Sequence, residues 1–311
     1  MACESSSFLV RLPGVEGRDH LTNDIFFSSC GSGPIVNIVF FGGDIQNEAD
    51  IMRVRPENRC YADKWSYESV AQLLLSRLEG VCGVHLWIVR ASRWLLQTFA
   101  CYDNFMRCNE SGAPDFSGVH SLRGCSTSAW LHLDALLQNA VTYVNGASTE
   151  CPCAIIGFSK GACVVTQLTY ELGLYVDLPV FLGIPLISRV ISLTWLDAGH
   201  NGQTHLWPTW TVALSRLKYR PSIPKLFVFA TPYELCDKNR PWNRRDFNTF
   251  LHILSTFNLP YHVETFYKGH RWDHLTEANS IPGAFCPTIE SHFEILASFP
   301  VNLCVSTSSD S

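Results

Sequence analysis

Residues 151–172, CPCAIIGFSKGACVVTQLTYEL, restrict the fold more than any other stretch of the chain. An apolar, β-prone run at 154–156 leads directly into the turn Gly-Phe-Ser-Lys-Gly at 157–161, and a helical pattern of apolar residues follows at once. In this strand, turn and helix context, G-x-S-x-G is typical of a nucleophile elbow, in which a strained turn holds a serine hydroxyl above the sheet edge. The pattern therefore predicts Ser159 as a nucleophile. The alternative is an ordinary turn whose glycines serve packing alone.

Strands and helices alternate along the rest of the chain. The near-continuous apolar run at 35–41 is typical of a strand buried on both faces of a parallel sheet, and further strands are expected at 153–158, 190–196 and 225–231. Amphipathic helices are expected at 65–78, 129–143, 246–257 and 288–299, further strands at 85–91 and 262–267, and an antiparallel pair at 8–12 and 24–29. This order predicts an α/β fold of the α/β-hydrolase type, with a mainly parallel sheet and helices on both faces.

Domain boundaries follow from the same patterns. We expect a single domain over residues 1–304 and a disordered tail at 305–311. The irregular, aromatic-rich segment 92–128 is expected to form a cap or insertion at the carboxyl edge of the sheet, with a packed loop as the equally weighted alternative.

Composition excludes several classes of protein. The formal net charge of −5, without any block of like charges, argues against nucleic acid as a partner. The sequence contains no run of about 18 uncharged apolar residues, so no transmembrane segment is predicted. The 13 cysteines are odd in number and scattered, which indicates reduced thiols and an intracellular protein. Residues 1–14 contain no visible targeting signal, and this favours the cytoplasm.

A serine nucleophile requires a histidine to accept its proton and a carboxylate to orient that histidine. In α/β-hydrolases the acid follows the serine in sequence and the histidine comes last. Asp237, after the strand at 225–231, is ranked first as the acid, because its loop gives it reach, whereas Glu234 lies close to the strand end. Asp197, one strand earlier, is the reserve acid.

The base is expected near the last helix. His292 is ranked first, with His270 in reserve and His274 also considered. The cluster His270-Arg271-Trp272-Asp273-His274 lacks a neighbouring cysteine or an HExxH pattern, so no metal and no cofactor are predicted.

The other half of a serine-hydrolase site is the oxyanion hole. Paired glycines follow the strand at 35–41, and an α/β-hydrolase places one oxyanion-binding N–H in that loop. Gly43 or Asp44 is expected to supply this N–H, and the backbone of Lys160 the second. A βα turn that needs glycine for its conformation is the alternative interpretation of Gly42 and Gly43.

Six segments together resemble the family labelled chromosome 2 open reading frame 69, over about residues 35–299. They are FFGGDIQN (40–47), CYDNF (101–105), GFSKG (157–161), WLDAGHNG (195–202), TPYELCD (231–237) and TIESHF (288–293). The resemblance implies an α/β-hydrolase-like fold, a serine-hydrolase site and, for animal members, a mitochondrial location. It supports Ser159 and His292 and is compatible with both Asp197 and Asp237. It supplies no substrate.

The leading hypothesis is a serine hydrolase that cleaves an ester or thioester, including acyl lipids, through an acyl-enzyme. Its partner is then a small-molecule or lipid acyl substrate. The competing hypothesis is a catalytically inactive, hydrolase-shaped binding or regulatory protein with a protein partner. A third hypothesis is a transferase that uses the same acyl-enzyme, and the sequence does not distinguish it from a hydrolase.

Overall fold

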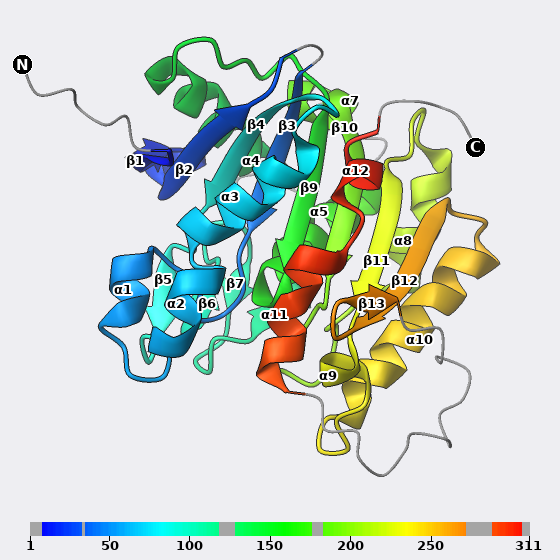
Figure 1. The fold of residues 1–311 in the computed structure, drawn as a ribbon. Coiled ribbons are helices and arrows are strands. Elements are labelled where there is room, and N and C mark those ends of the chain that lie inside the picture. Colours follow the sequence, from blue (N-terminus) through cyan, green and yellow to red (C-terminus); the bar gives the residue numbers. More distant parts are fainter. Residues whose placement is uncertain (1–7, 33–34, 118–127, 176–182, 272–287, 307–311) are drawn as a thin grey trace, which may run out of the picture.

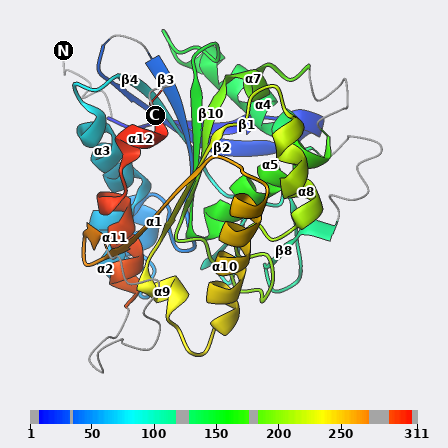
Figure 2. The same cartoon turned by 90° about the vertical axis from the view of Figure 1, so that its right-hand side faces the viewer.

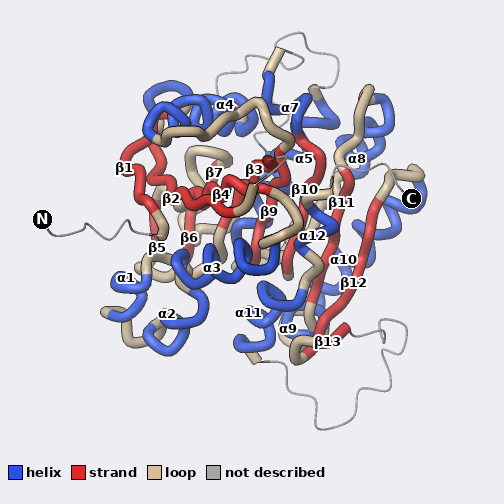
Figure 3. The backbone as a smooth tube through the Cα atoms, turned by 45° about the horizontal axis from the view of Figure 1, so that its top comes forward, coloured by secondary structure: helices blue, strands red, loops and turns tan. Residues whose placement is uncertain are grey.

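A computed structural model describes residues 8–32, 35–117, 128–175, 183–271 and 288–306. Within these residues one large sheet of nine strands has the order β1-β2-β4-β3-β9-β10-β11-β12-β13. Viewed obliquely, β1 and β13 lie at opposite ends of this sheet (Figure 3). The strands are β1 (Val10–Glu16), β2 (Thr22–Cys30), β3 (Ile35–Phe41), β4 (Gly83–Val89), β9 (Cys153–Phe158), β10 (Val190–Leu196), β11 (Lys225–Ala230), β12 (Tyr261–Tyr267) and β13 (His270–Arg271).

The centre of the sheet is parallel and its edges are antiparallel. Strands β4, β3, β9, β10, β11 and β12 run in the same direction, whereas β2 pairs with β4, β1 with β2, and β13 with β12 in antiparallel fashion. Every residue of β9 and β4 is buried, as expected for strands covered on both faces. The predicted α/β-hydrolase fold with its N-terminal antiparallel pair is confirmed. The carboxyl ends of the parallel strands therefore share one edge, where ligands bind in open α/β sheets.

Helices cover both faces of the sheet (Figure 1). Seen edge-on, α3, α11 and α12 lie on one side of it, and α4, α5, α8 and α10 lie on the other (Figure 2). Each layer encloses its own apolar cluster, one around Leu74 and Phe293 and the other around Trp130 and Trp195. The longer helices are α3 (Tyr67–Leu78), α4 (Ala129–Ala140), α5 (Ala162–Leu174), α10 (Pro241–Thr256) and α11 (Ile289–Ser298). The shorter ones are α1 (Ala49–Arg53), α2 (Arg59–Trp65), α7 (Pro185–Arg189), α8 (Thr211–Arg216), α9 (Pro232–Leu235) and α12 (Val301–Cys304).

Two short hairpins occupy the segment predicted to be a cap. They are β5 (Arg93–Leu95) with β6 (Phe99–Cys101), and β7 (Arg107–Cys108) with β8 (Pro114–Asp115). The hydroxyl of Tyr102 donates to the Gly42 carbonyl at 2.8 Å, and the Ala100 N–H donates to Asp44 Oδ1 at 2.7 Å. The segment is thereby fastened to the loop that follows β3. Residues 118–127 of the predicted cap lie outside the described residues.

Some boundaries differ from the predictions. The helix predicted at 65–78 begins at Tyr67, because Ser66 leaves the helical conformation and caps α3 by accepting the Ser69 N–H, while Trp65 ends the preceding helix α2. Helix α10 begins at Pro241 rather than at residue 246. The prediction of a disordered tail from residue 305 is wrong for Val305, which is buried in the core; residues 307–311 lie outside the described part. No described helix combines the length and hydropathy that a membrane span requires.

Candidate active site

The turn after β9 has the geometry of a nucleophile elbow. Ser159 has φ of 51°, a left-handed conformation that is costly for a residue with a Cβ. A single 3-10 turn, Ser159–Gly161, leads directly into α5. A Cβ at position 161 would lie 2.1 Å from the Phe41 carbonyl oxygen, so only glycine lets this turn pack on the end of β3. The side chain of Ser159 is thus presented at the carboxyl edge of the sheet.

His292 lies in the first turns of α11, which Thr288 caps by accepting the Ser291 N–H. Its Nδ1 is 2.6 Å from Oδ2 of Asp197. The imidazole packs against the tilted rings of Phe158 and Tyr233, whose centroids lie 4.7 and 4.9 Å away. The hydrogen bond and these ring contacts restrict the ring orientation, and they leave Nε2 as the nitrogen that is not turned toward Asp197.

Asp197 is the first residue after β10 and has no exposed surface. Its φ of 46° is a left-handed conformation, which is costly for a residue with a Cβ. The N–H of Thr231 donates to Oδ1 at 2.6 Å and the Thr231 hydroxyl donates to Oδ2 at 2.5 Å. A buried carboxylate needs such donors to compensate the loss of water. Together with the imidazole, they satisfy the charge of Asp197 within the protein.

The structure does not bring Asp237 to His292. Asp237 lies in the loop beyond α9, where its carboxylate accepts from Arg240 Nε at 2.8 Å and from the Asn239 N–H. These interactions with the arginine and the backbone lower the pKa of Asp237. The loop was expected to reach the histidine, but the short helix α9 directs Asp237 outward, and the reserve acid Asp197 occupies the position beside the imidazole.

The reserve base is also remote from these contacts. His270 is exposed on β13, the edge strand of the sheet, and no hydrogen bond between it and the residues around Ser159 is found in the described chain. His274 lies outside the described residues. Of the two considered histidines that the structure describes, His292 shares a cavity with Ser159 and His270 is not among its lining residues.

The residues expected to bind an oxyanion surround Ser159, but they are not equivalent. A Cβ on Gly43 would lie 2.8 Å from the Ser159 Cβ, so the loop after β3 passes directly beside the nucleophile. The N–H of Gly43, however, already donates to Gln46 Oε1 at 2.8 Å. The N–H groups of Asp44 and Lys160 are therefore the better candidates for an oxyanion hole.

The side chains of Asp44 and Lys160 fasten the cap segment. Lys160 is 1% exposed, and its ammonium donates to the Gly112 carbonyl at 2.5 Å and to Asn201 Oδ1 at 3.0 Å. Desolvation raises the pKa of Asp44, and the nearby Lys160 charge partly opposes this effect. Both residues thus place a backbone N–H near Ser159 while their side chains hold the hairpins between β5 and β8.

A cavity of about 290 Å³ opens at this edge of the sheet. Ser159 and His292 both line it, although Ser159 is only 9% exposed. Its walls combine apolar and aromatic side chains with a few polar groups, which is typical of a small-molecule site. The other lining residues are Asp44, Ile45, Thr98, Phe99, Gly199, His200, Asn201, Tyr233, Glu234, Arg240, Ile289 and Phe293.

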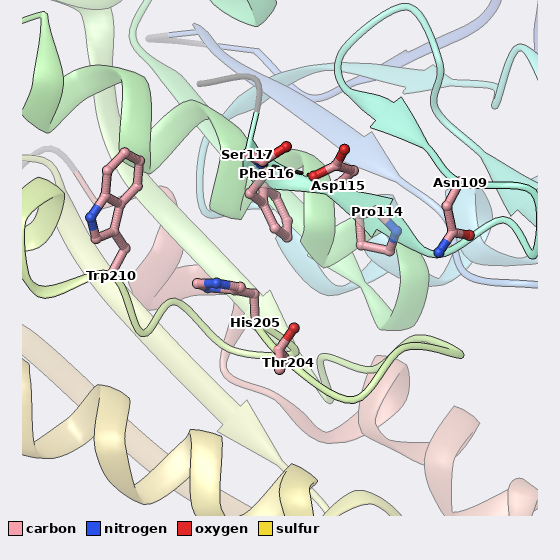
Figure 4. Close-up of a pocket in the computed structure, with 8 residues that line it drawn as sticks. All are labelled: Asn109, Pro114, Asp115, Phe116, Ser117, Thr204, His205 and Trp210. Carbon is pink, nitrogen blue, oxygen red and sulfur yellow. Dashed lines mark hydrogen bonds between the residues drawn. The ribbon is translucent and has the colours of Figure 1, made fainter. Parts of the chain in front are cut away.

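A second cavity, of about 570 Å³, lies between the β7–β8 hairpin and the loop after β10 (Figure 4). Phe116 and His205 face each other there, with ring centroids 5.7 Å apart. His205 Nδ1 is already engaged by the Tyr170 and Thr209 hydroxyls. Neither Ser159 nor His292 is among the described residues that line this cavity.

Three features of the site were missed in the sequence. Thr231 donates twice to Asp197, the ring of Tyr233 packs against His292 at a tilt, and Gln46 accepts the Gly43 N–H. A signal for Thr231 was present, since Thr-Pro at 231–232 is typical of a helix N-cap followed by proline in the first turn. That pattern predicts a polar hydroxyl at the end of β11. Nothing in the local sequence indicates the roles of Tyr233 and Gln46.

The fold and the elbow define a protein of the α/β-hydrolase fold class. The family model described as C2orf69 matches residues 11–151 and 147–260, and the chain belongs to this family. The curated relatives include the mitochondrial protein C2orf69 homolog of Danio rerio, 32% identical over 274 residues that cover 85% of this chain and 73% of the relative. The mitochondrial protein C2orf69 of Homo sapiens is 26% identical over 311 residues, covering 84% of this chain and 74% of the relative.

Solved structures with a similar arrangement include the enterobactin esterase FES from Shigella flexneri, with a TM-score of 0.46, 11% identity, and coverage of 84% of this chain and 54% of that one. A lipase/esterase from Lactobacillus plantarum has a TM-score of 0.42 and 11% identity, with 83% and 90% coverage. Similarities of this size carry no information on the activity of this chain. Function has to be inferred from the site.

Proposed function

We propose that this chain is a serine hydrolase that cleaves an ester or thioester of a small-molecule or lipid acyl group. Ser159 is the nucleophile, His292 the general base and acid, and Asp197 the residue that orients the imidazole. The observation that carries the proposal is the 2.6 Å contact between His292 Nδ1 and a fully buried Asp197, beside a serine with φ of 51° in the same cavity. A buried carboxylate, its contact with an imidazole and a serine with positive φ are each costly, and a turn that serves packing alone does not require this combination.

The proposed reaction uses each group in turn. Ser159 Oγ attacks the carbonyl carbon as His292 Nε2 takes its proton, and the N–H groups of Lys160 and Asp44 stabilise the resulting oxyanion. His292 then returns the proton to the leaving alcohol or thiol as the C–O or C–S bond breaks. Water attacks the acyl-enzyme with His292 again accepting a proton, and Ser159 regains its own.

The volume and the apolar lining of the cavity favour a substrate with a short acyl chain. Its apolar wall is formed by Ile45, Phe99, Ile289 and Phe293, and such side chains accommodate a hydrocarbon portion of the substrate. Its volume of about 290 Å³ lies at the lower end of ordinary ligand pockets. Substrates with short acyl chains are therefore expected to react faster than long-chain lipids.

A fluorophosphonate probe tests the assignment directly. The wild-type chain should be labelled covalently, and Ser159→Ala should not be labelled while melting at the same temperature. Ser188→Ala is the matched control, because Ser188 is an exposed serine on α7. Labelling that persists in Ser159→Ala would reject Ser159 as the nucleophile.

One observation favours a second candidate function, a binding protein with the shape of a hydrolase. Gly43 passes directly beside Ser159, but its N–H donates to Gln46 and is not available to an oxyanion. If the wild-type chain resists the probe and hydrolyses no ester or thioester in a panel of acyl chain lengths, this candidate replaces the enzyme.

The compartment is a separate proposal. The curated relatives from Danio rerio and Homo sapiens are named mitochondrial proteins, and we extend this location to the present chain. Immunodetection in fractionated cells that express the full-length gene product tests it. Recovery of the protein outside the mitochondrial fraction would contradict it.

A further inference from the structure

Glu234 is a second buried carboxylate in the wall of the proposed active site. It lies in α9, is 3% exposed, and lines the same cavity as Ser159 and His292. The mechanism proposed above does not use it. Because an ionisable group is costly to bury without a full set of partners, its surroundings require an explanation.

The carboxylate of Glu234 rests on the loop that carries Asp197. A Cβ on Gly199 would lie 2.6 and 2.9 Å from the two oxygens of Glu234, so glycine at this position makes room for the carboxylate. Thr231, which holds Asp197, is also the N-cap of the helix that contains Glu234. The positions of the two carboxylates are thus set by the same turn.

The positive charge next to Glu234 is shared. Arg240 Nη1 lies 3.4 and 3.3 Å from the two oxygens of Glu234, whereas Arg240 Nε donates to Asp237 at 2.8 Å. The side-chain amide of Asn243 also donates to Glu234. Arg240 is shared between Glu234 and Asp237, and the charge of Glu234 also interacts with Asp197 and His292.

The groups that face Glu234 come from four elements. Asp197 follows β10, and Tyr233 precedes Glu234 in α9. His292 lies in α11, and Arg240 and Asn243 are at the start of α10. The pKa of Glu234 is raised to about 7: burial is the largest cause, the charge of Asp197 adds to it, and the charges of His292 and Arg240 oppose it. The charges of Glu234 and His292 therefore interact.

We propose that Glu234 is a positioning residue for the general base: its negative charge stabilises the imidazolium form of His292, while Asp197 fixes the orientation of the ring. This inference rests on the proposed function for its catalytic consequence. The imidazolium forms during each proton transfer from Ser159, so a second negative charge in the wall of the same cavity lowers the energy of that state. Protonation of Glu234 removes the benefit, and hydrolysis slows on the acidic side of neutrality.

The test separates the electrostatic effect from catalysis. The titration of His292 is followed by NMR of the ring nitrogens in protein labelled with ¹⁵N-histidine, with His292→Asn used to assign the signal. In Glu234→Gln the midpoint of this titration should move to lower pH by about one unit, because a neighbouring charge is lost at unchanged side-chain size. Asp237→Asn is the matched control, since it removes a carboxylate that also contacts Arg240, and it should leave the midpoint unchanged.

A second variant and a second measurement complete the test. In Glu234→Asp the charge is retained but withdrawn by one methylene group, so the midpoint should fall between those of wild type and Glu234→Gln. The rate constant for fluorophosphonate labelling, measured against pH, should show the same order on its acidic limb, with a plateau up to about tenfold lower in Glu234→Gln.

The outcomes are distinct. A His292 midpoint that is the same in wild type and Glu234→Gln overturns the inference and leaves Glu234 as a structural partner of Arg240 and Asn243. A shifted midpoint in a protein that the probe does not label supports the electrostatic coupling and rejects the hydrolase. A shifted midpoint with altered labelling supports both.

Discussion

The loops that follow β10 and β11 begin at the same edge of the sheet and each carries acidic residues, but these residues differ in burial and in hydrogen-bond partners. After β10, Asp197 takes a left-handed conformation, turns inward and loses all contact with solvent. After β11, a four-residue helix turns Glu234 inward and leaves Asp237 outside, paired with Arg240. Distance from the strand end therefore does not decide which carboxylate contacts His292. Asp197, which makes this contact, is the carboxylate with buried hydrogen-bond donors from Thr231.

The two loops also depend on each other. Thr231, from the loop after β11, supplies two of the hydrogen bonds to Asp197. Glu234 from the same loop packs on Gly199 of the loop after β10. The second loop therefore contributes donors and an additional charge, and the first contributes the carboxylate that contacts the imidazole. Substitutions in the two loops should have effects of different size and kind.

Asp197→Asn should have the largest effect. The amide retains the size of the side chain but cannot hold the histidine in the tautomer that accepts the serine proton, and the comparable change in a serine protease triad costs about 10⁴ in kcat. We expect the fluorophosphonate labelling rate and the hydrolysis of p-nitrophenyl acetate to fall by about 10³–10⁴-fold. A loss below tenfold in a folded variant would remove Asp197 from the proposed mechanism.

Thr231→Val should have the next largest effect. It removes the hydroxyl that donates to Asp197 and accepts the Tyr233 N–H, while the Thr231 N–H bond to Asp197 remains. A hydrogen bond to a charged group contributes about 1.5–3 kcal/mol, so labelling should slow by roughly tenfold or more. Thr231→Ser keeps the hydroxyl and should restore most of the rate. Equal rates in the valine and serine variants would show that the hydroxyl does not support Asp197.

The sequence was sufficient to predict most of the sheet. Strands β3 and β10 coincide with the predicted ranges, because uninterrupted apolar runs between polar loops are typical of central parallel strands. The six helices of four to seven residues described here, α1, α2, α7, α8, α9 and α12, were not predicted. Such helices are too short for a 3.6-residue period to emerge, and most of their stability comes from packing.

The candidate site was less predictable than the sheet. Ser159 follows from a local motif, and His292 from its place near the last helix. The choice between Asp197 and Asp237 depends on burial and on a left-handed φ at the end of β10, and residue types do not encode either property locally. Asp197 remains a proposal as the catalytic acid until its variant is measured.

Glu234→Gln should change the pH dependence of stability. Burial raises the pKa of Glu234 to about 7 in the folded protein, so the folded state binds this proton more tightly than the unfolded chain does. The stability that this group contributes is present below its ordinary pKa and is lost as the pH rises toward 7. The melting temperature of the variant relative to wild type should therefore increase between pH 5 and pH 8, by about 2 °C or more.

A matched acid-to-amide substitution outside the cavity provides the control for the labelling measurement, because burial raises the pKa of Glu171 as well. In Glu171→Gln the carboxylate that caps α4 is replaced, and this group accepts bonds from Ser128, Ala129 and Trp130 on the far side of the sheet. Its variant should melt lower than wild type while the acidic limb of labelling keeps its position. If the melting temperatures of Glu234→Gln and wild type differ by the same amount at every pH from 5 to 8, the proposed titration of Glu234 near neutral pH is wrong.

Asp237→Asn should have the smallest effect. Asp237 is partly exposed, its donors are Arg240 and the Asn239 N–H, and it makes no contact with His292 in the described structure. An exposed ion pair contributes about 0–1 kcal/mol, so labelling should change by less than about threefold and the melting temperature only slightly. A loss comparable to that of Asp197→Asn would mean that the loop after β11 rearranges when substrate binds and brings Asp237 to the imidazole. The contrast between the two loops would then hold only for the free protein.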